Sequence, residues 1–132
     1  MNKKKIALEV FTWLITLFVV AIFFRTGMAK FAARGWWVDS FRMWGYPDWF
    51  RIAIGVIEVG GLLMLWPRVA SYVSLTLAAV MVGAVGTLIN ATPNRRSITP
   101  VILIVLCCTI AALRWNQRLR VSAPVAERHA DA

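Results

Sequence analysis

Four long apolar stretches, separated by short polar connectors, dominate the pattern of hydrophobic and polar positions along the chain. They cover residues 6–24, 50–66, 69–89 and 98–115. Each stretch is close to the roughly 17–25 residues that a helix needs to cross a hydrocarbon core of about 30 Å. The pattern therefore predicts an all-α integral membrane four-helix bundle over residues 1–116, followed by a flexible polar C-terminal tail over residues 117–132.

The segment between the first two stretches predicts further helix. Residues 25–34 consist mainly of good helix formers, so we expect the first helix to continue to Arg34. Trp37, Phe41 and Trp44 then share one helical face, and Gly45 is suited to end that helix. We therefore predict a short interfacial helix between helices one and two.

Aromatic residues concentrate in this same segment, which holds four of the seven tryptophans. An interfacial aromatic belt is one interpretation, because tryptophan and tyrosine favour the headgroup level of a bilayer. A wall around a ligand is the other. The residues concerned are Trp37, Trp44, Tyr46 and Trp49.

Composition narrows the class of protein. The 132 residues are 60% hydrophobic, and the short connectors leave no room for a soluble catalytic domain. The net charge of +9 is spread over the termini and the connectors, which indicates contact with the headgroups of a lipid bilayer rather than with nucleic acid. The single histidine, His129, lies in the tail, and Cys107 and Cys108 are adjacent in the fourth stretch. These positions exclude a bis-histidine haem inside the bundle and predict no metal site.

Basic residues also bear on orientation. Four spans place both termini on one side of the membrane, and the lysines and arginines divide almost evenly between the two sides. If Arg25 and Lys30 lie inside the bundle, they no longer count as charges of the side opposite the termini. Cytoplasmic termini are then favoured, because cytoplasmic segments carry the excess of Lys and Arg. We therefore expect a multi-pass protein of the inner (cytoplasmic) membrane with both termini in the cytoplasm.

Glu58 is the only acidic residue deep inside an apolar stretch. A charged carboxylate at the bilayer centre costs about 2.5–3.5 kcal/mol on insertion scales, so it needs a proton or a basic partner. Lys30 or Arg25 of the first helix is the expected partner, since Arg51 lies two turns away on the helix of Glu58 itself. The resulting buried polar site either fixes the register of the helices or serves a function.

Two patterns support this polar site. A polar stripe on the first helix should face the bundle interior, because lipid would reject it. The stripe consists of Glu9, Thr12, Thr16, Thr26 and Lys30. Small residues in the second and third stretches predict close helix packing around Glu58. They are Gly55, Gly60, Gly61, Ala79 and Gly83.

Three runs of the sequence resemble the DoxX family. They are Arg25-Thr-Gly-Met-Ala-Lys30, Trp44-Gly-Tyr-Pro-Asp-Trp49 and Gly55-Val-Ile-Glu-Val-Gly-Gly-Leu-Leu-Met-Leu-Trp-Pro-Arg68. The resemblance implies a four-helix membrane bundle in which Lys30, Glu58 and Gly61 are the family-pattern positions. Relatives of this kind are described as small subunits associated with quinone-linked sulfur or terminal-oxidase chemistry.

The resemblance and the polar site together lead to three hypotheses. The first is an accessory or redox-associated membrane subunit with a quinone as candidate cofactor, membrane redox subunits as partners and no catalysis on its own. The second is a small proton-coupled transporter that uses Glu58. The third is a structural partner that assembles with another membrane protein or forms a homo-oligomer.

Overall fold

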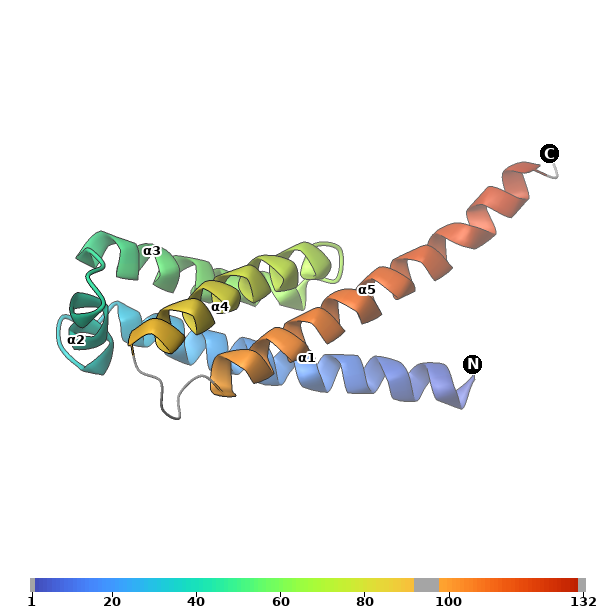
Figure 1. Ribbon diagram of the computed structural model, residues 1–132. Coiled ribbons are helices and arrows are strands. Elements are labelled where there is room, and N and C mark those ends of the chain that lie inside the picture. The colour runs from blue at the N-terminus through green and yellow to red at the C-terminus, as the bar shows by residue number, and fades with distance from the viewer. Residues whose placement is uncertain (1, 92–97, 131–132) are drawn as a thin grey trace.

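The computed structural model describes residues 2–91 and 98–130, and for residues 122–130 it describes the backbone alone. Every regular element within these residues is a helix, which confirms the predicted all-α class. The elements are α1 (Lys3–Lys30), α2 (Trp36–Met43), α3 (Asp48–Val59), the 3-10 helix η1 (Gly60–Leu65), α4 (Ala70–Ala91) and α5 (Ile98–Ala130). Figure 1 shows α2 at one end of the molecule, opposite the start of α1 and the end of α5.

Three of these helices are long and apolar enough to cross a membrane, namely α1, α4 and α5 over Ile98–Val121. The second predicted span takes another form. Its α-helix ends at Val59 and continues as η1, so residues 50–66 are not the single long α-helix that we expected. The adjacent glycines at positions 60 and 61 lower the α-helical propensity there. Trp66, which precedes a proline, is extended and ends η1.

Two predicted helix boundaries are wrong. The first helix ends at Lys30 rather than at Arg34, and the chain then turns at Gly35. The φ of 130° at Gly35 is hardly accessible to a residue with a side chain. At the other end of the chain, α5 continues past residue 116 to Ala130, where we predicted a flexible tail. Residues 131–132 of that tail lie outside the described residues.

The short helix between α1 and α3 lies where the sequence indicated. It covers Trp36–Met43, and Gly45 follows it with a φ of 81°, as expected beyond a helix C-terminus. Val38 and Phe41 of α2 are buried, whereas Met43 is exposed. One face of α2 therefore packs on the bundle, and its location in a membrane interface remains a prediction.

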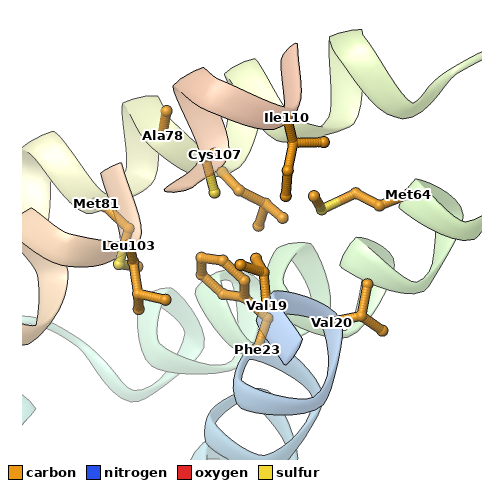
Figure 2. Close-up of a cluster of buried hydrophobic side chains, with 10 residues drawn as sticks. Val19, Val20, Phe23, Met64, Ala78, Met81, Leu103, Cys107 and Ile110 are labelled. Carbon is orange, nitrogen blue, oxygen red and sulfur yellow. The ribbon is translucent and has the colours of Figure 1, made fainter. Parts of the chain in front are cut away.

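The hydrophobic core lies between α1, η1, α4 and α5, and Figure 2 shows side chains from all four elements meeting there. Phe23, Met64, Leu77 and Ile110 are its largest fully buried apolar side chains. Helix α4 packs along α5, and α1 packs along α3. The core joins these two helix pairs, and a cavity separates them toward α2.

Candidate functional site

One face of α3 supplies the buried polar residues of the site. Its three buried residues are Arg51, Gly55 and Glu58, which recur at intervals of four and three positions. This spacing places them in one row along the helix. The row faces the last turn of α1, where Glu58 binds the Lys30 ammonium, Arg51 binds the Lys30 carbonyl group and Gly55 lies close to the backbone of α1. The side chain and the backbone of Lys30 are therefore both bound by α3.

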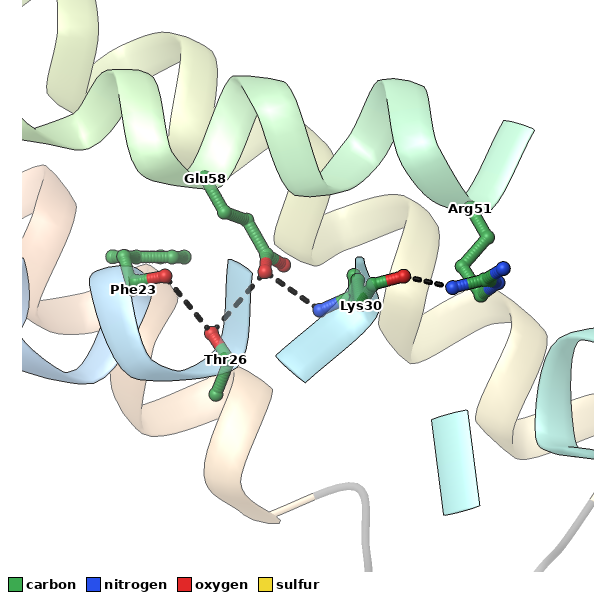
Figure 3. Close-up of polar contacts among 5 residues, drawn as sticks. All are labelled: Phe23, Thr26, Lys30, Arg51 and Glu58. Atoms are coloured by element: carbon green, nitrogen blue, oxygen red, sulfur yellow. Dashed lines mark hydrogen bonds and ion pairs between the residues drawn. The ribbon is translucent and has the colours of Figure 1, made fainter. Parts of the chain in front are cut away.

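Glu58 and Lys30 form a buried ion pair. The Lys30 ammonium lies 2.6 Å from Oε2 of Glu58, and the two residues are only 3% and 2% exposed. The hydroxyl of Thr26, one turn earlier on α1, lies 3.2 Å from the same carboxylate oxygen (Figure 3). Trp37 of α2 completes the surroundings, because the ammonium lies 3.8 Å from the centroid of its ring. At that distance a cation is attracted by the face of the ring.

Two glycines let α1 and α3 approach closely enough for this pair. A Cβ atom on Gly27 would lie 2.9 Å from a methyl carbon of Val59 and 3.0 Å from the carbonyl oxygen of Gly55. A Cβ atom on Gly55 would lie 3.1 Å from the carbonyl oxygen of Gly27. Each glycine thus packs against the backbone of the other helix. Gly27 was not among the predicted packing residues, although it lies between Thr26 and Lys30 in the family-like run.

Arg51 closes the end of α1. Its guanidinium donates hydrogen bonds to the carbonyl oxygens of Lys30 and, at 3.1 Å, of Ala32, as Figure 3 shows for Lys30. These carbonyl groups lack partners in the helix because α1 stops at Lys30. From the sequence we considered Arg51 only as a partner of Glu58 and did not predict its hydrogen bonds to the end of α1. Arg51 lies four residues before Gly55, on the same face of α3 as Gly55 and Glu58, and this spacing could have indicated that Arg51 is buried against α1.

A cavity of about 520 Å³ lies beside the ion pair, and we call it the chamber. Its volume is in the range of ligand pockets, about 300–1,000 Å³. The polar part of its wall includes Thr26, Lys30 and Glu58. The aromatic part includes Trp36, Trp37, Phe41, Trp44, Tyr46 and Phe50. Six of the seven aromatic residues between positions 35 and 50 therefore line the chamber, as the ligand-wall interpretation requires.

A hydrogen bond joins this aromatic wall to α4. The hydroxyl groups of Tyr46 and Thr87 lie 3.0 Å apart, and both residues line the chamber. They also line a second, more open pocket, to which Asn90 contributes. The Tyr46–Thr87 bond thus lies at the boundary between the chamber and the outer pocket.

Several predicted site residues lie elsewhere. Arg25 is exposed and forms none of the ion pairs that the structure gives for the described residues, so its prediction as a partner of Glu58 is wrong. Trp49 is 69% exposed and does not line the chamber. In the polar stripe, Thr12 and Thr16 are buried and donate to the backbone of their own helix, whereas Glu9 is exposed.

Only some of the residues predicted to allow close helix packing lie against another helix. Gly61 approaches Leu77 of α4, with 3.1 Å between its Cβ position and a methyl carbon of that leucine. Gly60 and Gly83 have no atom within 4 Å of their Cβ positions, and Ala79 is exposed. The close approach predicted at these three residues is therefore wrong, and the space at Gly83 belongs to the chamber that this residue lines.

Gly27→Ala is expected to destabilise the fold by about 1–3 kcal/mol, because the added methyl group collides with Val59 and with backbone that cannot move alone. The matched control is Gly86→Ala in α4, where nothing lies within 4 Å. That change should leave stability equal or raise it by up to about 1 kcal/mol through helix propensity. Unfolding by SDS titration in lipid bicelles measures both. Equal effects of the two changes would contradict the close crossing.

Lys30→Met is expected to cost about 3–5 kcal/mol, because it leaves the Glu58 carboxylate buried without a cation. The double change Lys30→Met with Glu58→Met should recover most of that loss, since it removes both charges. The exposed pair Arg42–Asp48, at 3.3 Å, is the control, and Arg42→Gln should cost less than about 1 kcal/mol. A double variant no more stable than Lys30→Met would show that the two residues are not coupled.

Comparison with known proteins adds one finding. The model of the DoxX-like family matches residues 14–110, a range that contains the α1–α3 crossing and the ion pair. No curated protein and no solved structure matches the chain. The match covers well over half of the chain, and the described residues include three helices capable of crossing a membrane. The chain is therefore a multi-pass membrane protein and belongs to the DoxX-like family.

Proposed function

We propose that this protein binds an amphipathic small molecule of quinone type in the chamber and serves as an accessory subunit beside a membrane redox complex, without catalysing a reaction on its own. The observation that carries the proposal is the position of the Lys30–Glu58 pair, which forms part of the wall of an otherwise largely apolar, aromatic chamber. Apolar pockets with a few convergent polar groups are typical of small-molecule sites.

The wall of the chamber suits a flat head group with a carbonyl oxygen. Lys30 supplies an ammonium donor, and Glu58 supplies an acceptor beside it. Phe41, Tyr46 and Phe50 offer ring faces, with the Tyr46 and Phe50 rings stacked at 4.9 Å. Aromatic rings of this kind pack favourably on one another and on planar ligands. An apolar tail would continue along side chains such as Val80 and Leu103.

We further propose that α3 and η1 together make a fourth membrane crossing. The twelve residues of α3 at about 1.5 Å each and the six of η1 at about 2.0 Å each form a rod of about 30 Å, the thickness of a hydrocarbon core. Four crossings place both termini on one side. We assign that side to the cytoplasm of the inner membrane, because Lys3, Lys4 and Lys5 lie in the first turn of α1 there, whereas Lys30 at the opposite end of α1 is buried in the ion pair.

Binding of decylubiquinone to the purified protein in nanodiscs tests this function. Trp36, Trp37 and Trp44 line the chamber, so a bound quinone should quench their fluorescence beyond the quenching seen with empty nanodiscs plus free tryptophan. Lys30→Gln should weaken binding about tenfold, which corresponds to roughly 1.4 kcal/mol. Arg25→Gln, an exposed change on the same helix, should leave it unaltered. Absence of saturable quenching, or equal loss in both variants, would refute the proposal.

An assembly role is the second candidate, and one observation favours it. Ala79 is exposed and lines neither pocket, so the face of α4 around this small residue is not covered within the described residues, whereas Gly83 lines the chamber. Such faces allow another membrane helix to approach closely. Ala79→Leu should then release a stoichiometric neighbour, or a second copy of the chain, that co-purifies in mild detergent. Purification of the unaltered protein as a lone monomer would count against this role.

A further inference from the structure

We propose that the chamber selects an amphipathic anion over a neutral amphiphile of the same shape. The inference rests on the proposed function, and it specifies the charge of the head group that the chamber takes. It comes from the balance of buried charges around the chamber and from the donors that remain available on its wall.

The buried charges at the α1–α3 crossing do not cancel. Lys30, Arg51 and Glu58 are 3%, 6% and 2% exposed, so two cations share one carboxylate. The other acidic residues at this end of the fold, Asp39 and Asp48, are exposed, and Asp48 pairs with Arg42. Neither can neutralise a buried cation. The crossing therefore carries an excess of one positive charge.

The end of α1 offsets only part of that excess. Arg51 donates to the carbonyl oxygens of Lys30 and Ala32, at a helix C-terminus that carries about half a unit of negative charge. The N-terminus of α3, whose first turn holds Arg51, carries a similar charge of opposite sign, so a net positive charge remains. In an apolar interior this charge acts over several ångströms, because the effective dielectric constant is far below that of water.

The Lys30 ammonium also keeps donor capacity on the wall. The Lys30 ammonium has three N–H groups, of which one meets Glu58 at 2.6 Å while Trp37 covers another side at 3.8 Å. Oε2 of Glu58 already accepts from both Lys30 and Thr26. A negatively charged ligand oxygen beside Lys30 would use the remaining donor capacity and reduce the uncompensated charge at once.

The rest of the wall requires an apolar body behind that head. Ile22, Phe23, Val80, Met81 and Leu103 line the chamber away from the ion pair. An inorganic anion would lose its hydration against these side chains without gaining apolar contacts in return. A long-tailed anion also loses hydration at its head, but burial of its tail against these apolar side chains offsets part of that cost while the head contacts Lys30.

A matched pair of ligands tests the inference. The probes are 2-hydroxy-3-decyl-1,4-naphthoquinone, whose enol is ionised at neutral pH, and its neutral 2-methoxy derivative. Both are titrated against the full-length protein in nanodiscs of zwitterionic lipid, with tryptophan fluorescence as the signal and with correction for partition into empty nanodiscs. We expect the hydroxy compound to bind about tenfold more tightly. Sodium sulfate, an anion without an apolar body, should not compete.

Charge variants locate the origin of the preference. Arg51→Gln should bring the two affinities within about twofold, whereas Arg42→Gln, an exposed change, should leave the tenfold preference intact. Equal affinities in the unaltered protein, or competition by sulfate, would overturn the inference while leaving the proposed function standing. A preference that survives Arg51→Gln in a folded variant would also overturn it. Saturable binding of neither compound would remove the proposed function itself.

Discussion

A carboxylate and an ammonium held out of water inside an apolar protein set the central constraint on this structure. Each charge alone would cost several kcal/mol, and together they are tolerable only in close contact. The 2.6 Å distance between Lys30 and Glu58 meets that condition. The pair lies where α1 and α3 cross almost backbone to backbone, which Gly27 and Gly55 allow. The ion pair and the two glycines therefore stabilise the same helix crossing.

The same constraint shapes what surrounds the pair. The first helix stops at Lys30, Arg51 binds the carbonyl groups of Lys30 and Ala32 that this leaves free, and the chain then continues into α2. This path brings the ring of Trp37 over the Lys30 ammonium. The chamber lies beneath these aromatic residues, between the α1–α3 pair and the α4–α5 pair. The ion pair, the end of α1 and the chamber thus lie next to one another at a single helix crossing.

The class of the protein and the identity of the central acid followed from local properties of the chain. Hydrophobic length predicts membrane-capable helices without reference to packing, and the structure has three of them. Glu58 stood out because its surroundings in sequence are apolar. The position of Lys30 on a polar face of the first helix was enough to name it as a partner, since the period of a helix is regular.

Choices between similar candidates depended on the fold. Arg25 and Lys30 both lie near the end of α1, but only Lys30 points at α3. Side chains five residues apart on a helix differ in direction by more than a third of a turn. Likewise, Gly27 and Gly55 meet another helix whereas Gly60 and Gly83 do not. The chain by itself determined which groups must be buried and paired. Only the tertiary structure decided which neighbour pairs with which, because that depends on where two helices cross rather than on either helix alone.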